Sequence, residues 1–166
     1  MIRKAIKEDL YRIIEITNAC AVHMISQNIF QWNEKYPNME TFRNDLNNKN
    51  LFVIEFENKI VGCVCVSDKM DEVYKKVKWL TLNNKNMYIH RLAIDPIFQR
   101  KGFALQLMSY AEKLAIDKGF ISIRLDTFSK NLKNNKFYKL QGYKKIGKIF
   151  YRDQSDMPFH CYEKII

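Results

Sequence analysis

Hydrophobic residues recur every three or four positions along residues 8–27, with polar residues on the opposite side, which predicts an amphipathic helix. The same spacing predicts a second helix over residues 39–46, where Asn38 can cap the first turn. A third helix is predicted over residues 104–118 and a short fourth one over residues 134–141. Both of these are followed directly by a glycine, as is common at helix C-termini.

Runs of apolar and β-branched residues bounded by turn residues predict the strands. They cover residues 1–6, 51–56, 60–66, 87–94, 121–126, 143–151 and 159–166. Only three residues separate the second run from the third, which indicates a hairpin, whereas residues 68–86 are polar and irregular. Because helices precede and interleave with strands and no linker is present, we predict one α+β or mixed α/β domain over residues 1–166, with helices on both sides of the sheet.

Lys and Arg outnumber Asp and Glu by 28 to 18, and the net charge of +10 favours an anionic partner such as a nucleic acid, an acidic protein or a phosphorylated cofactor. The basic residues are dispersed, however, and no five of them occur in a row, which is typical of a solvated surface. No DNA-recognition or base-stacking motif accompanies them, so a nucleic-acid partner is not expected.

The four cysteines include no CxxC pair, and they complete no zinc-binding spacing with the three histidines. We therefore expect reduced, buried cysteines and no metal site. No apolar run reaches about 18 residues and no signal-peptide pattern is present. A cytoplasmic protein without membrane association is the expectation that follows.

The stretch Gln-Arg-Lys-Gly-Phe-Ala at residues 99–104 carries the strongest chemical signal. The preceding strand ends at Ile94, and pairing stops there because Pro96 has no N–H to donate to a neighbouring strand. Gly102 then stands at the start of a helix, where free backbone N–H groups and the helix dipole attract anions, and two basic side chains precede it. The stretch therefore predicts a phosphate or pyrophosphate site, although it contains neither GxxxxGK[ST] nor GxGxxG.

In this context the stretch resembles the acyl-CoA loop Q/R-x-x-G-x-G/A of the GNAT superfamily of N-acetyltransferases. Residues 131–143 are similar to a second motif of that superfamily, N-x-x-A-x-x-x-Y-x-x-x-G-F. Asn131, Tyr138 and Gly142 match this motif, whereas Asn134 and Tyr143 depart from it. The order of elements is similar over nearly the whole chain, and QWNEKYP at residues 31–37 looks like a stretch of bacterial members without an assigned substrate. The resemblance implies a GNAT-like, mostly antiparallel twisted sheet, acetyl-CoA as co-substrate and, as in some relatives, a homodimer.

The resemblance also implies roles for individual residues. For the cofactor, these are Leu92, Ala93 and Ile94 along the pantetheine arm, the loop residues Gln99, Arg100, Lys101, Gly102, Phe103 and Ala104 at the pyrophosphate, and Asn131. For the chemistry, they are Tyr138 near the thioester sulfur and Asp126 at a position where some members have a catalytic carboxylate. For the acceptor, they are Trp32, Tyr36 and His90.

Each of these residues also has a purely structural interpretation. The three strand residues would be apolar in any core, and the two basic side chains of the loop could simply be solvated. Tyr138 could be a packing aromatic, Asp126 a carboxylate at a strand end, and His90 a hydrogen-bonded strand residue. The aromatic pair before residue 37 could be a hydrophobic lid instead of a substrate wall.

Acetyl transfer from a thioester to an amine needs a neutral amine, donors for the developing oxyanion and stabilisation of the departing thiolate. A free tyrosine has a pKa near 10 and a thiol near 8.5, so full proton transfer from Tyr138 to sulfur is uphill by about 2 kcal/mol. We therefore expect either that basic surroundings lower the pKa of Tyr138 or that it donates a hydrogen bond without full transfer.

Three functions are compatible with the sequence. The first is an acetyl-CoA-dependent N-acetyltransferase acting on a primary amine of a small molecule or peptide, and the motifs favour it. The second is a non-catalytic acyl-CoA-binding or sensing module of the same fold, which would bind the cofactor without turnover. The third is nucleic-acid binding, which would show as a strongly salt-dependent affinity.

Overall fold

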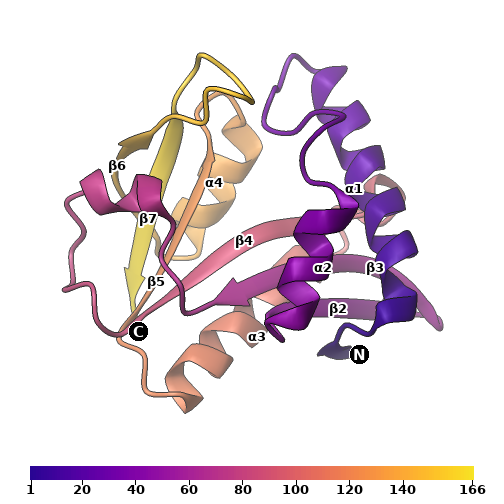
Figure 1. Cartoon of the computed structure of the whole chain (residues 1–166), viewed down its shortest axis with the longest axis horizontal. Helices are drawn as coiled ribbons and strands as arrows, with labels where there is room; N and C mark the ends of the chain where they lie inside the picture. The colour runs from indigo at the N-terminus through magenta and orange to yellow at the C-terminus, as the bar shows by residue number, and fades with distance from the viewer.

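All 166 residues are described by the computed structural model, which has a seven-stranded sheet with helices on both faces (Figure 1). The strands are β1 (Ile2–Lys4), β2 (Leu51–Phe56), β3 (Lys59–Ser67), β4 (Asn86–Ile94), β5 (Ser122–Phe128), β6 (Lys144–Ile149) and β7 (Phe159–Ile165). The α-helices are α1 (Leu10–Ile25), α2 (Met39–Asn47), α3 (Phe103–Asp117) and α4 (Leu132–Leu140). Three short 3-10 helices are η1 (Lys7–Asp9), η2 (Glu72–Lys76) and η3 (Pro96–Phe98).

The strands lie in the order β1-β2-β3-β4-β5-β7-β6, and β4 with β5 is the one parallel pair. The expected mixed fold with a mostly antiparallel sheet and helices on both sides is therefore confirmed. The boundaries differ by a few residues from those expected. The fourth helix, for example, begins two residues earlier, because the side-chain Oδ1 of Asn131 accepts the N–H of Asn134 and caps the first turn.

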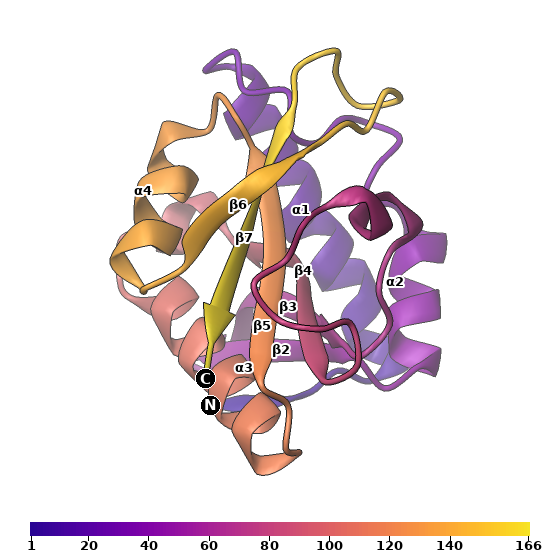
Figure 2. The same cartoon turned by 90° about the vertical axis from the view of Figure 1, so that its left-hand side faces the viewer.

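Three apolar clusters join the layers. Leu107 and Met108 of α3 pack against one face of the sheet, and Ile13 of α1 and Phe42 of α2 pack against the other. The third cluster lies under the chain around η2, which passes in front of β4 and β5 in Figure 2. All four cysteines are buried and unpaired, as their spacing predicts. None of the helices combines the length and the apolarity that crossing a bilayer requires.

The pairing between β4 and β5 is short. It joins residues 86–88 of β4 to residues 122–124 of β5 and stops there. Beyond this point β4 carries a bulge opposite residues 63–65 of β3, and Arg91 within it has a φ of 52°. Figure 1 shows the two strands side by side at one end and well apart at the other. The sheet therefore opens between its fourth and fifth strands.

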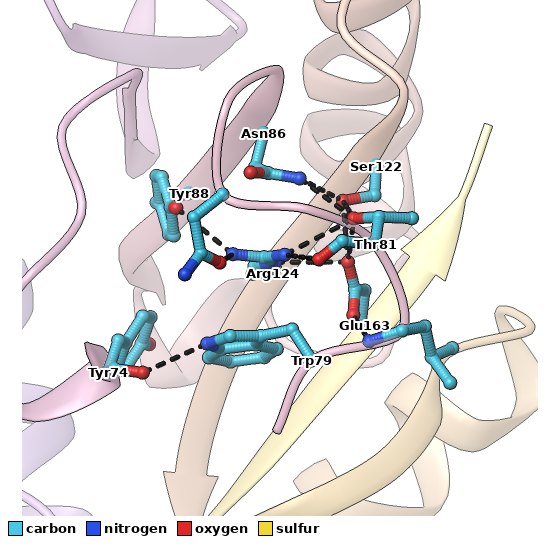
Figure 3. Close-up of polar contacts among 10 residues, drawn as sticks. Tyr74, Trp79, Thr81, Asn86, Tyr88, Ser122, Arg124 and Glu163 are labelled. Atoms are coloured by element: carbon cyan, nitrogen blue, oxygen red, sulfur yellow. Dashed lines mark hydrogen bonds and ion pairs between the residues drawn. The ribbon is translucent and has the colours of Figure 1, made fainter. Parts of the chain in front are cut away.

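A buried ion pair holds the closed end of this opening (Figure 3). Arg124 of β5 and Glu163 of β7 have fully buried side chains, and Arg124 Nε donates to Glu163 Oε1 over 3.0 Å. Thr81 and Ser122 donate their hydroxyls to the same carboxylate, and the Trp79 ring lies 4.6 Å from the guanidinium carbon. Burial alone would raise the pKa of Glu163, but these donors outweigh it and hold the pKa below its usual value.

The same cluster positions the segment before β4. The Arg124 guanidinium donates to the Thr81 carbonyl over 2.6 Å, and Leu80 donates its N–H to Glu163. Trp79 in turn donates its indole N–H to the Tyr74 carbonyl over 3.0 Å. The polar stretch that the sequence presents as irregular is therefore fixed to the sheet, and with it Tyr74, which reaches the site described below.

Glu163→Gln keeps the shape of the side chain but leaves the Arg124 guanidinium buried without a countercharge. We expect the free energy of unfolding, measured by urea denaturation, to fall by about 3–5 kcal/mol. Asp117→Asn is the control, because it removes the partner of an exposed pair with Lys113 at 3.6 Å and should cost less than about 0.5 kcal/mol. Equal losses in the two variants would contradict the role assigned to the buried pair.

Candidate active site

The loop between β4 and α3 presents a row of free backbone N–H groups. The first hydrogen bond of α3 runs from Gln106 N–H to the Gly102 carbonyl, so the N–H groups of residues 100–105 have no acceptor within the chain. Gly102 has a φ of 84°, and a Cβ placed on it would meet no atom within 4 Å. Free N–H groups at the N-terminus of a 15-residue helix, next to open space, form a site that fits a phosphate or pyrophosphate.

The end of β4 that faces the opening has further backbone polar groups that do not pair with another strand. Ala93 lies opposite Cys63 in the ladder, and Asp95 donates its N–H to β3. Because hydrogen-bonding directions alternate along an antiparallel strand, Leu92 and the N–H of Ile94 face the side where β5 would otherwise pair. The Ile94 carbonyl already accepts from Cys20 Sγ and Gln99 Nε2, each over 3.1 Å. An extended ligand arm can therefore pair with β4 along this edge.

A pocket of about 530 Å³ follows the loop and this edge of β4, and we call it the cofactor pocket. It brings together all but one of the residues that the sequence assigns to the cofactor. These are Leu92, Ala93, Ile94, Gln99, Arg100, Gly102, Phe103, Ala104, Asn131 and Tyr138. Lys101 is outside the lining, and its ammonium group packs over the Phe98 ring at 5.1 Å. The Asn131 amide also binds within the protein, since its Nδ2 donates to Gln31 over 3.0 Å.

A second pocket of about 280 Å³ adjoins the first, and we call it the acceptor pocket. It brings together the remaining predicted residues, Trp32, Tyr36, His90 and Asp126, with Tyr138. The two pockets share Gln31, Trp32, Leu92 and Tyr138 in their linings, so they meet at these residues. A ligand in one pocket can therefore reach a ligand in the other at the point where β4 leaves β5.

Asp126 of β5 lies in the wall of the acceptor pocket, and two tyrosines donate to its carboxylate. Tyr74 Oη lies 2.5 Å and Tyr151 Oη 3.2 Å from Asp126 Oδ2. Burial raises the pKa of Asp126 to about 6, although these two donors act to lower it. At neutral pH the carboxylate is therefore ionised and has a pKa suited to accepting a proton. The sequence does not indicate a site role for either tyrosine, because Tyr74 lies in the irregular stretch of residues 68–86 and Tyr151 at the end of a predicted strand.

Tyr138 is buried between the two pockets, and its hydroxyl makes no hydrogen bond within the chain. Burial, followed by the charge of Asp126, raises its pKa above the usual value for tyrosine. The expectation that basic surroundings lower this pKa is wrong, because the lysines of α4 are exposed to solvent and the charge that acts on Tyr138 is that of Asp126. A raised pKa disfavours full proton transfer to sulfur and favours the other role expected for Tyr138, hydrogen-bond donation.

His90 of β4 points into the acceptor pocket and makes no hydrogen bond. Its nearest charged partner is Asp71, with 3.9 Å between Nδ1 and Oδ2. Burial, with a smaller contribution from Arg91, lowers the pKa of His90 to about 3, so the imidazole is neutral at physiological pH. The interpretation of His90 as a hydrogen-bonded strand residue is therefore wrong.

Residues 10–143 match the acetyltransferase (GNAT) family. The chain belongs to this family. Over 100 residues it is 30% identical to N-acetyltransferase 8 of Homo sapiens, a match that spans 60% of this chain and only 40% of the human protein.

Solved structures of GNAT proteins share the fold over the whole chain. An acetyltransferase of the GNAT family from Streptococcus agalactiae 2603 is 25% identical with a TM-score of 0.79, over 100% of this chain and 95% of that one. The PaiA N-acetyltransferase of Thermoplasma acidophilum, solved in complex with coenzyme A, is 19% identical with a TM-score of 0.73, over 100% and 98% of the two chains.

Membership of the GNAT family confirms the family and the enzyme class expected from the two motifs, an acyltransferase that uses acetyl-CoA as co-substrate. The free N–H groups of residues 100–105 and the open space at Gly102 fit the pyrophosphate of that co-substrate. No group of three or more His, Cys, Asp or Glu side chains is placed to hold a metal ion.

Gly102→Asp puts a carboxylate among these N–H groups, where it would repel a pyrophosphate. We expect acetyl-CoA binding, measured by calorimetry, to weaken by tenfold or more, on the order expected for an added like charge. Gly119→Asp is a matched control, because Gly119 has a similar φ of 74°, has equally open space at its Cβ and lies outside both pockets. If both variants bound acetyl-CoA equally well, the loop would not be the pyrophosphate site.

Proposed function

We propose that residues 1–166 act as one acetyl-CoA-dependent N-acetyltransferase domain. It would transfer an acetyl group to a primary amine of a small molecule or peptide by direct attack of that amine on the thioester. The observation that supports this most is the meeting of two pockets at Leu92 and Tyr138, one next to an anion-binding loop and the other next to a carboxylate. The homodimer implied by the resemblance stays a prediction.

On the cofactor side, the loop binds and the strand orients. The N–H groups of residues 100–105 would hold the pyrophosphate, with the Arg100 side chain beside them, and the backbone of Leu92 and Ile94 would pair with the pantetheine arm. When bound, acetyl-CoA supplies an activated acetyl group as a thioester. Backbone N–H groups of the bulged part of β4 are the available donors to the oxygen that becomes negative during the transfer.

On the acceptor side, Asp126 would take the proton of the attacking amine. An amine with a pKa near 10.4 costs about 4.6 kcal/mol to deprotonate at pH 7, whereas an α-amine with a pKa near 7.8 costs about 1 kcal/mol. A carboxylate with a pKa of about 6 next to the reaction point can take a proton from the amine. The reaction then depends less on the small fraction of the amine that is already neutral in solution. Asp126 would therefore matter most for an acceptor of high pKa.

Tyr138 would donate a hydrogen bond to the departing sulfur. Because its pKa is raised, the proton stays on the phenol while the donor stabilises the developing thiolate. The second candidate is a non-catalytic acyl-CoA-binding module on this fold. The raised pKa of Tyr138 favours it as well, because a protein that only binds acyl-CoA needs no proton donor at the sulfur. The role of Tyr138 therefore distinguishes the two functions.

Tyr138→Phe should lower kcat by roughly 10²-fold, the order lost when one donor to a developing charge is removed. The dissociation constant for acetyl-CoA should change much less, because the hydroxyl acts mainly in the transition state. Steady-state kinetics with a primary-amine acceptor, together with calorimetry, give both numbers. Tyr143→Phe is the control, because Tyr143 packs beside Tyr138, with 6.0 Å between ring centres, but lines neither pocket. An unchanged kcat in Tyr138→Phe would favour the binding module.

The pH profile of kcat tests Asp126 as the base. A base works when ionised, so kcat should rise with pH through about 6, and Asp126→Asn should lose this limb. The groups that act on its carboxyl are Tyr74 and Tyr151, which lower its pKa, Asp71, which raises it, and Arg91, which lowers it. Tyr74→Phe removes one stabilising donor, so the midpoint should move to higher pH. A midpoint that stays in place in Tyr74→Phe would contradict the assignment.

A further inference from the structure

The acceptor pocket contains an excess of negative charge. Its one guanidinium, that of Arg91, is already paired, since it donates to both carboxylate oxygens of Asp45 at 2.7 and 2.6 Å and to Tyr36 Oη at 3.0 Å. The carboxylates of Asp71 and Asp126 also line the pocket and have no cationic side chain paired with them there. The pocket therefore attracts a cation and repels a ligand that carries a carboxylate.

The two free carboxylates lie at different depths. Asp126 lines the same pocket as Tyr138, and its Oδ2 accepts hydrogen bonds from two tyrosines. Asp71 precedes η2, its side chain is 49% exposed, and its carboxylate accepts no hydrogen bond. One carboxylate is thus placed to take a proton at the thioester, and the other lies free at the solvent end of the same pocket.

His90 is an independent sign that a ligand belongs beside Asp71. Its side chain is only 10% exposed, it lines the pocket, and it makes no hydrogen bond. The imidazole faces the pocket without a hydrogen-bond partner in the protein, so a ligand there can supply a hydrogen bond to it. Because the ring is neutral, it can accept a hydrogen bond from an ammonium group without repelling it.

The remaining walls suit a short alkyl chain. Trp32, Tyr36, Tyr151 and Phe159 contribute aromatic surface to the pocket, which packs against methylene groups and attracts cations. The two loops that supply most of these residues also contact each other, since Asn33 Nδ2 donates to the Asp153 carbonyl over 3.4 Å. This contact and the volume of about 280 Å³ favour a small molecule over a peptide.

From these observations we propose that the acceptor is a small aliphatic diamine, whose second ammonium group binds between Asp71 and His90. The inference rests on the proposed N-acetyltransferase function. One nitrogen gives its proton to Asp126 and forms the C–N bond to the acetyl carbon, while the thioester C–S bond breaks and its electron pair leaves with sulfur. The other nitrogen stays protonated and holds the substrate in register with the thioester.

The test compares three acceptors with the same four-carbon chain: putrescine, 4-amino-1-butanol and 4-aminobutanoate. They differ in the distal group, which is an ammonium, a hydroxyl or a carboxylate. For the wild-type protein we expect kcat/KM to be roughly tenfold or more higher for putrescine than for the amino alcohol, the order of one hydrogen bond between charged groups, and lowest for the carboxylate. This expected ratio exceeds the factor of about two that putrescine gains from having two equivalent amines.

Asp71→Asn removes the distal charge and keeps the shape of the side chain. It should lower the ratio of kcat/KM for putrescine to kcat/KM for 4-amino-1-butanol by roughly tenfold, because any effect on Asp126 is common to both acceptors. Glu72→Gln is the matched control, because Glu72 is the next residue, is 83% exposed, lines neither pocket and should affect neither acceptor. Equal wild-type values for putrescine and the amino alcohol, a preference that survives Asp71→Asn, or faster turnover of a peptide α-amine would each overturn the proposal.

Failure of the proposed function gives a different result. Acetyl-CoA binding without turnover of any of these acceptors or of a peptide α-amine would overturn the acetyltransferase mechanism and the diamine inference together. Turnover that is lost in Asp126→Asn but shows no dependence on Asp71 would overturn the diamine inference alone.

Discussion

Backbone pairing between β4 and β5 ends after three residues on each strand, and every part of the site depends on this early end. Longer pairing would use the backbone groups of Leu92 and Ile94 and would fill the space where the two pockets meet. The buried pair of Arg124 and Glu163 holds the strands together at the closed end, and the bulge at Arg91 directs β4 away at the open end. An interaction remote from the chemistry thus determines where the chemistry can occur.

Charge is divided sharply between the two sides of this opening. Residues 100–105 offer free N–H groups and the Arg100 side chain to an anionic cofactor, while the acceptor pocket offers carboxylates to a cation. The net charge of +10 agrees in sign with the cofactor side but not with the acceptor pocket, which carries negative charge. Burial raises the pKa of both acidic groups at the reaction point, to about 6 for Asp126 and above its usual value for Tyr138. In the proposed mechanism, Asp126 acts as a base and Tyr138 as a hydrogen-bond donor.

Features with a local cause could be predicted from the sequence. The glycine at 102 adopts the left-handed conformation that only glycine enters readily, Pro96 follows the end of its strand, and Asn131 caps its helix. The contacts that define the acceptor side join distant residues, such as Tyr74 to Asp126 across 52 positions. No local pattern encodes such a pair, and the pKa of Tyr138 depends on the depth of its burial, which the α4 sequence alone does not show.

The most direct test of this account is a crystal structure of the protein with acetyl-CoA bound. The account predicts the pyrophosphate on the N–H groups of residues 100–105, the pantetheine arm along Leu92 and Ile94, and the sulfur within hydrogen-bonding distance of Tyr138 Oη. It also predicts that the acetyl group faces Asp126 across the junction of the two pockets. A cofactor bound elsewhere, or a thioester remote from Tyr138 and from the acceptor pocket, would contradict the account.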